Sequence, residues 1–421
     1  IEESLIDDAV SRILRIKFRL GLFDGKALRE QQPNANLVGC KAHREIALNA
    51  ALESIVLLKN SNNILPLSDE LKKVAVIGPN ANYWVAQLGD WSFKTGNMTQ
   101  DQAILDSQEH FTTTVTVLEG IKRRLSGKSK VLYSSGCHIQ NPNDINIPQA
   151  IQVAQTSDVI ITVIGDTHGL NGERKDRASL KLPGAQINLL KALKELGKPL
   201  ITILVNGKPL ELSWLVHHAD AILEAFNPGC EGGTALAKIL FGDYNPSGKL
   251  SISFPKTVGQ IPVYYNQYPG WHGGRYIDLD NRFLDGGHAI PLFPFGFGLS
   301  YTQFEYSHLN ISKPRISIKE SVKISVKVKN CGNRFGEEIV QLYINDKYSS
   351  VTTPIKELRR FKKLSLNPGQ EKIAFFELEP IDFALVLPNL TRKVEEGEFV
   401  IFVGGSSRDN DLIKETLIIQ D

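Results

Sequence analysis

The sequence is 421 residues long, more than one domain usually contains, and this length predicts two or three domains. Hydrophobic residues make up 42% and charged residues 22%, as in globular proteins, which excludes a disordered or fibrous chain. The 48 Lys and Arg residues nearly balance the 46 Asp and Glu residues and are scattered, so we expect no nucleic acid partner. No apolar run reaches the ~18 residues of a membrane helix, so no membrane partner is expected.

The four cysteines lie far apart, without the Cys-x-x-Cys spacing of a zinc or redox site. We expect buried free thiols, and the sequence predicts neither a metal nor a cofactor. The first residue, Ile1, falls inside a helical pattern with no signal peptide before it, which predicts that an upstream part is missing. The sequence leaves open whether the protein is cytoplasmic or exported.

The chain opens with the pattern of an amphipathic helix. Apolar residues at the spacing i, i+3, i+4 and i+7 predict a helix over residues 1–20 that ends at Gly21. A linker is predicted around residues 31–34, and a second helix over residues 42–59. The apolar stripe of the first helix needs a surface to bury against, and it consists of Ile6, Ala9, Val10, Ile13 and Leu14.

Residues 36–258 alternate between strand and helix patterns. Helical patterns at 149–156 and 185–196 lie between short apolar runs, which gives the βαβα order of a doubly wound sheet. Runs of this kind are typical of parallel strands that are buried on both faces. The runs are Val74–Ile77, Val159–Ile164, Leu200–Val205 and Ala221–Leu223. We therefore predict an αβα sandwich with a mostly parallel sheet.

The remaining chain has a different pattern. Residues 259–300 are rich in Gly, Pro and aromatic residues, which predicts a structured connector. From Tyr301 the apolar period changes to two, as at 322–328 and 340–344, which indicates half-buried antiparallel strands. Residues 301–421 are therefore predicted to form an all-β sandwich of the fibronectin type III kind.

A nucleotide site is the first alternative for a doubly wound sheet, because ligands bind at the carboxyl ends of its strands. After the run 74–77 the chain reads Gly78-Pro79-Asn80, without a glycine-rich phosphate motif. Pro79 also lacks the amide that an anion site would use. The sequence therefore disfavours a nucleotide-binding regulator.

The loop 165–177 gathers ionisable side chains directly after the predicted strand 159–164. Acid/base chemistry needs a carboxylate that can reach a substrate, with neighbours that tune its pKa. Asp166 and His168 are near Glu173 in sequence, and a solvated His168 is expected. From the spacing alone, a charged surface loop is the simpler interpretation.

Several segments resemble glycoside hydrolase family 3 in their order and spacing. Glu173–Arg177, followed by Leu180, Leu182, Pro183 and Gly184, is similar to the family's Glu-x-x-Asp-Arg…Leu-x-Leu-Pro-Gly segment. The other matching segments are Asn206–Leu210, Pro228–Gly233, Phe241–Leu250 and Pro294–Thr302. Together they extend the resemblance over nearly the whole chain.

The resemblance implies a (β/α)8 barrel before the αβα sandwich, with residues 1–35 as the last barrel helix and a linker. Members are typically retaining, exo-acting enzymes of the β-glucosidase kind that use two carboxylates. Glu173 matches the acid/base, whereas the nucleophile is an Asp on the barrel, which this chain lacks. We therefore expect an oligosaccharide or β-glucoside substrate, a barrel domain or chain as partner, and no turnover by this chain alone.

The same resemblance suggests supporting residues. Asp176 and Arg177 are expected to organise the loop by pairing with each other or with the backbone. Sugar rings stack on aromatic side chains and their hydroxyls bind guanidinium groups, and packing between domains is the alternative for each tryptophan. The candidates for substrate binding are Trp91, Trp271, Arg275 and Arg282.

A different class of function is also compatible with the sequence. The chain could be a non-catalytic carbohydrate-binding or scaffolding fragment that holds a partner enzyme through its sandwich. Loss of activity on replacement of Glu173 in a complete assembly distinguishes the enzyme from the scaffold. The sugar, the linkage and the oligomeric state are left open by the sequence.

Overall fold

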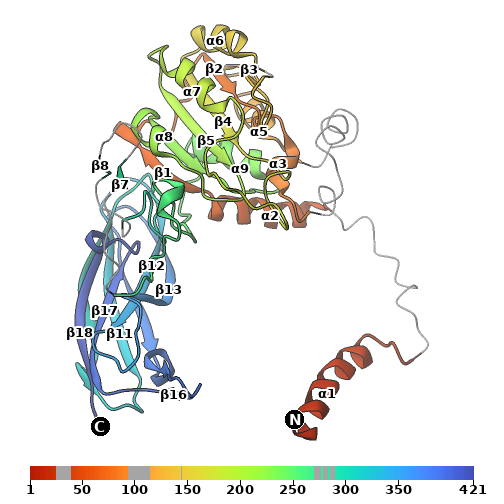
Figure 1. Cartoon of the computed structure of the whole chain (residues 1–421). Coiled ribbons are helices and arrows are strands. Elements are labelled where there is room, and N and C mark those ends of the chain that lie inside the picture. The colour runs from red at the N-terminus through yellow and green to blue at the C-terminus, as the bar shows by residue number, and fades with distance from the viewer. Residues whose placement is uncertain (25–38, 93–113, 144, 270–275, 278–282, 285–289) are drawn as a thin grey trace. The chain divides into compact units, whose positions relative to one another are not determined.

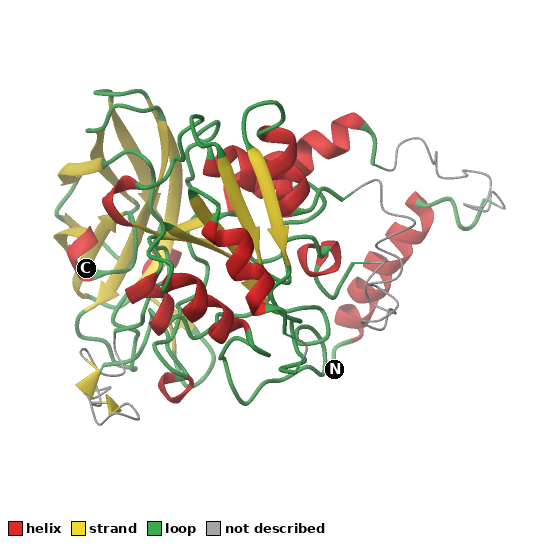
Figure 2. Ribbon diagram, turned by 90° about the horizontal axis from the view of Figure 1, so that it is seen from above, coloured by secondary structure: helices red, strands yellow, loops and turns green. Residues whose placement is uncertain are grey.

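The computed structural model describes residues 1–24, 39–92, 114–143, 145–269, 276–277, 283–284 and 290–421 (Figures 1 and 2). The chain divides into two units, residues 1–46 and residues 47–421, and each is described by itself. The domain boundaries expected from the sequence, at residues 35, 258 and 300, stay a prediction.

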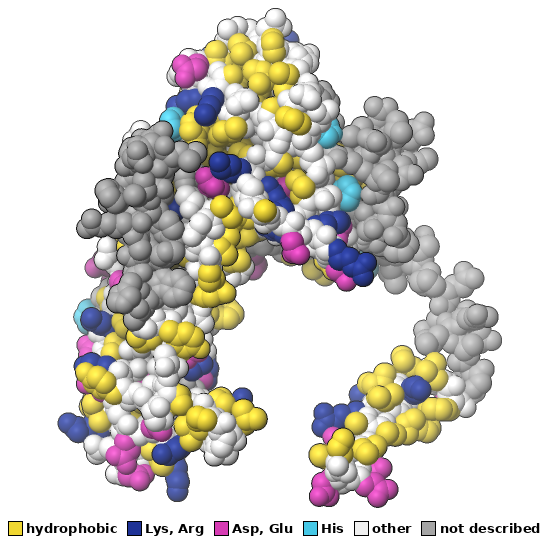
Figure 3. All heavy atoms as spheres, viewed as in Figure 1, with side chains coloured by type: hydrophobic (Ala, Val, Ile, Leu, Met, Phe, Trp, Pro, Cys, Tyr) yellow, Lys and Arg dark blue, Asp and Glu magenta, His cyan; other side chains and the backbone are white. Residues whose placement is uncertain are grey.

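Helix α1 (Glu3–Arg19) confirms the helix predicted at the start of the chain. Glu3 lies in its first turn and Arg19 in its last, where each charge complements the helix dipole. Gly21, with a φ of 67°, follows the last turn in a left-handed conformation that favours glycine. None of the α1 residues is buried, so its apolar stripe lies on the surface of this unit (Figure 3).

The helix predicted over 42–59 is wrong at its C-terminal end. Helix α2 (Lys41–Ser54) stops early, and residues Val56–Asn60 form strand β1 instead. Val56, Leu57 and Leu58 are all buried. A helix that packs through one face would bury only part of such a run, whereas a strand whose two faces are both covered can bury successive residues, as the first three residues of β1 do.

Six strands form one sheet in the order β1-β6-β5-β4-β2-β3. All neighbours in this sheet are parallel except β1, which runs antiparallel to β6. This confirms the predicted mostly parallel sheet. The further strands are β2 (Lys73–Ile77), β3 (Lys130–Ser134), β4 (Val159–Gly165), β5 (Leu200–Val205) and β6 (Ala221–Glu224). The sequence reasoning missed β3, because this edge strand is mostly only partly buried and shows no continuous apolar run.

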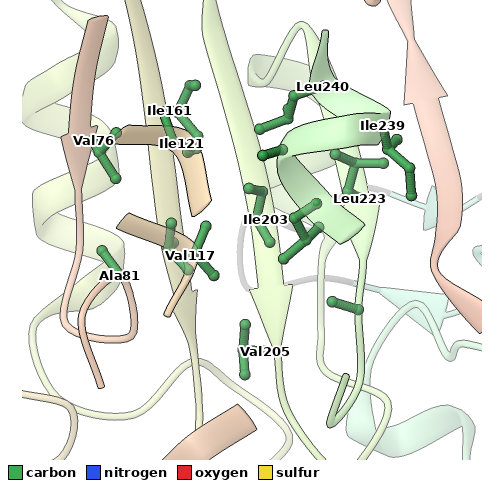
Figure 4. Close-up of a cluster of buried hydrophobic side chains, with 14 of the residues drawn as sticks. Val76, Ala81, Val117, Ile121, Ile161, Ile203, Val205, Leu223, Ile239 and Leu240 are labelled. Carbon is green, nitrogen blue, oxygen red and sulfur yellow. The ribbon is translucent and has the colours of Figure 1, made fainter. Parts of the chain in front are cut away.

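Helices cover both faces of the sheet (Figure 1), and alternate strand residues are buried against each face. One face buries Val76, Ile161 and Ile203 against helices α5 and α9, as Figure 4 shows. The opposite face packs against α6, α7 and α8. The helix bounds are α3 (Trp84–Leu88), α5 (Val117–Arg124), α6 (Ile147–Gln155), α7 (Gln186–Lys194), α8 (Ser213–His218) and α9 (Gly232–Leu240).

Helices α5 and α9 touch through two glycines. A Cβ atom added at Gly120 would lie 2.0 Å from the carbonyl oxygen of Gly233. A Cβ atom added at Gly233 would lie 2.0 Å from the carbonyl oxygen of Thr116. Both positions therefore need glycine because of the close backbone approach.

The C-terminal part is a β-sandwich of two sheets, as predicted for a fibronectin-like domain. The first sheet has the order β10-β18-β17-β12-β13 and the second the order β14-β11-β9. Alternate residues such as Val322, Ile324 and Val326 are buried between the sheets. The strands are β9 (Phe304–Ile311), β10 (Arg315–Ile316), β11 (Val322–Asn330), β12 (Gly336–Asp346), β13 (Glu357–Leu366), β14 (Glu371–Leu378), β17 (Gly397–Gly404) and β18 (Leu412–Ile419).

Two short strand pairs complete the fold. β7 (Tyr276–Ile277) pairs with β8 (Phe283–Leu284) in the connector, and β15 (Leu385–Val386) pairs with β16 (Arg392–Lys393) beside the sandwich.

The cysteines are free, but the expectation that they are buried is wrong for three of them. Only Cys137 is buried, whereas Cys40 and Cys230 are partly buried and Cys331 is exposed. Among the described helices, none combines the length and the apolar character that a membrane span requires.

Candidate active site

The loops after β2 and β4 meet at a point where the strand order reverses. β2 is followed along the chain by β3 on one side, and β4 then lies on the other side of β2. Such a switch point leaves space at the carboxyl ends of the strands, where ligands of open α/β sheets bind. The buried Asn80 side chain ties the loop after β2 to the ends of β4 and β5, since Nδ2 donates to the carbonyl oxygens of Asp166 (2.9 Å) and Val205 (3.1 Å).

Asp166 anchors the base of the loop 165–177. Its side chain is buried and accepts hydrogen bonds from Asn171 Nδ2 and from the amide of Gly207 (3.2 Å). The Arg177 guanidinium lies 3.6 Å from Asp166 Oδ2, as an ion pair longer than a hydrogen bond. Burial raises the pKa of Asp166 to about 6, against the opposing effect of these partners. Asp166 therefore ties the beginning of the loop to its end.

Glu224, the last residue of β6, is a second buried carboxyl group in this region. It accepts hydrogen bonds from the Phe226 amide (2.8 Å) and from Asn206 Nδ2 (3.3 Å). Complete burial, with a smaller contribution from the nearby charge of Asp166, raises the pKa of Glu224 to about 8 against the opposing effect of the two hydrogen bonds. Glu224 is therefore protonated at neutral pH. The sequence reasoning missed it, although it is the one charged residue in the run Ala221–Glu224.

Two lysines hold the middle of the loop. Lys175 Nζ forms an ion pair with Asp90 and donates to the carbonyl oxygen of His168 (2.6 Å). Lys208 Nζ donates to the carbonyl oxygens of Leu170 (3.1 Å) and Lys175. These contacts were not predicted from the sequence, because no motif pairs residues 85 positions apart.

Gly172 lets the Asp90 side chain approach the loop. Its φ is 103°, and a Cβ atom added there would lie 1.9 Å from Asp90 Oδ2. The turn that carries Asp90 is therefore packed directly against the loop backbone.

Glu173 differs from its neighbours in this network. Its side chain is exposed, and no hydrogen bond or ion pair joins its carboxyl to any described residue. The following residue, Arg174, has a φ of 61°, in the left-handed region, so the backbone turns sharply beside Glu173. The loop is fixed on both sides and presents two such free carboxyl groups, those of Glu173 and the exposed Asp176, and a carboxyl group held in this way can transfer a proton to a bound substrate.

Three of the other predicted site residues, Asp176, Arg177 and Trp91, lie in the described part of the chain. Arg177 Nη2 donates to the Lys181 carbonyl oxygen (2.7 Å), and Asp176 is exposed. Trp91 is 78% exposed and directly follows Asp90, the partner of Lys175. Trp271, Arg275 and Arg282 lie outside the described residues, so their roles stay predictions.

The expectation of a solvated His168 is wrong. Its side chain is only 5% exposed, and Nδ1 lies 3.1 Å from Thr167 Oγ1. The glycine-rich sequence around His168 suggested an open loop, whereas the network around Asp166 folds this segment against the sheet. In the part of the chain that the structure describes, no cluster of His, Cys, Asp and Glu residues could hold a metal ion.

Comparison with family models gives two matches. Residues 55–301 match the glycosyl hydrolase family 3 C-terminal domain, and residues 338–407 match a fibronectin type III-like domain. The first match contains the loop 165–177, Asp90 and Glu224. The second lies within the β-sandwich.

Curated and solved proteins resemble almost the whole chain. A β-xylosidase of Formosa agariphila is 39% identical over 99% of this chain, and a periplasmic β-glucosidase of Salmonella typhimurium is 37% identical over 96%. The crystal structure of a Listeria innocua β-glucosidase in complex with isofagomine matches with a TM-score of 0.82 at 33% identity and covers the full chain. This chain spans only 55%, 54% and 56% of those three proteins, respectively.

Proposed function

Because the chain belongs to glycoside hydrolase family 3, we propose that it is the C-terminal part of a retaining, exo-acting glycosidase, with Glu173 as its general acid/base. The single observation that carries this proposal is that Glu173, at the glutamate position of the family motif, presents a free carboxyl on a loop that is otherwise held by Asp166, Lys175 and Lys208. A solvated side chain of purely structural origin would not need such fixation of the residues around it.

The proposed chemistry has two proton transfers through one group. In the first step, protonated Glu173 donates its proton to the glycosidic oxygen as the bond to the anomeric carbon breaks and a carboxylate nucleophile attacks. In the second step, ionised Glu173 takes a proton from the water that releases the sugar from the nucleophile. Both steps need Glu173 near the scissile bond, and the loop anchors described above hold the backbone for this purpose.

The nucleophile must come from another part of the enzyme. The resemblance assigns it to an Asp on a (β/α)8 barrel, which stands before Ile1 in the family. In agreement, the curated relatives are about twice as long as this chain. We expect this chain alone to be inactive and to act once a barrel domain or chain supplies the second carboxylate.

Terminal β-linked sugars are the proposed substrates. The matched relatives are named as β-xylosidase and β-glucosidase, which favours glucose or xylose at the cleaved end. Trp91, with its exposed ring beside the loop anchor Asp90, is the described candidate for stacking on the sugar.

The test is hydrolysis of aryl β-glucosides and aryl β-xylosides by this chain alone and after mixing with a family 3 barrel fragment that ends before Ile1. Activity is expected only in the mixture, and Glu173→Gln should lower it about a hundredfold or more. The rate of the first step should fall least for a dinitrophenyl glycoside, because its leaving group departs without a proton. It should fall most for an alkyl glycoside.

Asp176→Asn is the matched control, because Asp176 is an exposed carboxylate in the same loop. It should retain most of the activity. Activity of the chain alone would show that the nucleophile has been assigned to the wrong place. If the mixture is active and Glu173→Gln leaves this activity unchanged for every leaving group, Glu173 is not the acid/base. If the mixture is inactive, the scaffolding alternative is favoured.

A further inference from the structure

A cavity lies where the connector meets the β-sandwich. Its volume is about 450 Å³, within the ~300–1,000 Å³ that small-molecule sites usually occupy. The lining residues of the connector fall within 264–267 and 290–294. Those of the sandwich are residues 355–356, just before β13, and residues 407–410, between β17 and β18. None of the lining residues belongs to the loop 165–177 or to the turn with Trp91.

Four polar side chains of the lining are free to bind a ligand. Tyr264, Arg408 and Asn410 are exposed, and Gln267 is partly buried. No hydrogen bond or ion pair joins the polar side-chain atoms of these four residues to another described residue. The Gln267 amide atoms are not among the buried polar atoms that lack a partner, so solvent reaches them as well. A ligand in the cavity can therefore exchange its bonds with water for bonds to these groups.

The lining carries two cations and one anion. Lys356 forms an ion pair with Asp409 and donates to the Ser407 carbonyl oxygen (3.0 Å), so its ammonium group already has partners. Arg408 lies over the ring of Phe297, with the guanidinium carbon 4.8 Å from the ring centre. One unpaired guanidinium beside a closed ion pair selects weakly for a multiply charged anion, whereas its N–H groups can donate to neutral hydroxyl oxygens.

The lining also offers one free aromatic ring. Tyr264 is 63% exposed, and an exposed ring can pack against the apolar face of a sugar. Tyr265 is not available for this purpose, because it stacks on Phe295 with ring centres 4.2 Å apart. Ile290 is also exposed and adds apolar surface to the lining. An aromatic ring combined with free amides and a guanidinium matches a pyranose ring with its hydroxyls.

Hydrogen bonds hold the two walls of the cavity together. The Ile355 amide donates to the Gln267 carbonyl oxygen (2.8 Å). The Ser407 amide (3.1 Å) and hydroxyl (2.8 Å) both donate to the Phe295 carbonyl oxygen. These bonds join the connector to both segments of the sandwich that line the cavity. A site with fixed walls binds without a large ordering cost.

From these observations we propose that the junction of the connector and the β-sandwich carries a binding site for a saccharide. The sugar ring packs on Tyr264. Its hydroxyls bind the amides of Gln267 and Asn410 and the guanidinium of Arg408. A primary amide has an acceptor oxygen and two donor hydrogens, and a hydroxyl is both donor and acceptor, so the two groups can bond in either direction. The site holds a glycan chain through residues that take no part in the proposed hydrolysis.

The experiment is calorimetric titration of the full chain with cellotetraose and with xylotetraose. Wild type should bind at least one of them, and Tyr264→Ala should weaken binding about tenfold or more because the stacking ring is lost. Asn410→Ala should weaken binding about fivefold, since one hydrogen-bonding amide is removed. Both side chains are exposed, and an unchanged midpoint of urea unfolding verifies the fold of each variant.

Two control variants separate this site from other surfaces. Tyr348→Ala removes another exposed tyrosine ring, 74% exposed, which does not line the cavity. Trp91→Ala removes the aromatic residue beside the candidate active site. Both should bind the tetrasaccharide like wild type.

Three results would overturn the proposal. One is the absence of binding to either tetrasaccharide. Another is loss of binding in Trp91→Ala with unchanged binding in Tyr264→Ala, which would place the sugar at the switch point of the sheet. The third is displacement of the bound saccharide by inorganic sulfate at constant ionic strength, which would identify the cavity as an anion site.

Discussion

Lys175 and Asp90 form an ion pair that joins the loop bearing Glu173 to the turn bearing Trp91. Lys175 is two residues after Glu173, and Asp90 is the residue before Trp91. The side chains are 29% and 13% exposed, so water screens this pair less than it screens a surface pair. The proposed proton donor and the proposed sugar platform are therefore connected by one electrostatic contact.

Replacement of either partner should destabilise the protein, and the two effects should not add. Asp90→Asn or Lys175→Met leaves one half-buried charge without its partner, whereas the double variant removes both charges. A double-mutant cycle in urea should give a coupling free energy above about 1 kcal/mol. The exposed pair Glu119–Arg123 is the control, with a coupling of about 0.5 kcal/mol or less.

The same variants test whether the ion pair positions the loop for catalysis. In the reconstituted enzyme, Lys175→Met should lower kcat about tenfold, because displacement of the loop moves Glu173 away from the glycosidic oxygen. Glycosides with good leaving groups should be affected less than those with poor ones. An equal loss for all leaving groups would point to a general loss of folded protein instead.

Trp91→Ala should change substrate binding more than stability. The ring is 78% exposed, so its removal should alter the free energy of unfolding of this chain by less than about 0.5 kcal/mol. KM for aryl β-glycosides should rise about tenfold in the reconstituted enzyme, since stacking on the sugar is lost. A large loss of stability with unchanged KM would support the packing alternative for this tryptophan.

The sheet could be predicted from the sequence because its central strands are buried on both faces. Val159–Gly165 and Leu200–Val205 show this burial as continuous apolar runs. The edges were harder for two different reasons. β3 is partly exposed and lacks the run, and β1 follows α2 so closely that its apolar residues looked like more helix.

The candidate site was only partly predictable. Glu173 could be proposed from the sequence because it lies in a local motif, and its role stays a prediction. The pairs Lys175–Asp90 and Asp166–Arg177 depend on how the loop folds back on the sheet. His168 is buried for the same reason, because the loop folds back on the sheet. The sequence of a glycine-rich loop does not show which of its ionisable residues will be buried. Glu224 ends the apolar strand β6, and only the structure shows that its carboxyl group is buried there.

Glu224→Gln should flatten the dependence of stability on pH. The pKa of Glu224 is raised from 4.5 to about 8 in the folded protein, so folding takes up a proton between these values. Stability from this group is complete below pH 4.5 and is lost as the pH rises to 8, by about 1.4 kcal/mol per pH unit. The free energy of unfolding in urea, taken as wild type minus variant, should therefore decrease from pH 5 to pH 8 and remain constant above pH 8.

Asp166 contributes with the same sign over a lower range, from pH 3.8 to about 6. Because both proteins retain Asp166, the difference between them isolates Glu224. The glutamine side chain of the variant is expected to keep an oxygen that accepts from the Phe226 amide, so the fold should survive. Parallel stability profiles for the two proteins would contradict a protonated Glu224.

Gly120→Ala should be strongly destabilising although alanine is the better helix former. In an isolated helix this substitution would stabilise by roughly 0.5–1 kcal/mol. Here the new Cβ would lie 2.0 Å from the Gly233 carbonyl oxygen, so α5 and α9 would have to separate, at a cost of about 3 kcal/mol or more. Urea unfolding against Lys122→Ala, on the exposed side of α5, measures the difference. Equal stability of the two variants would show that the helices can move apart freely and that the close contact of these two glycines does not determine their packing.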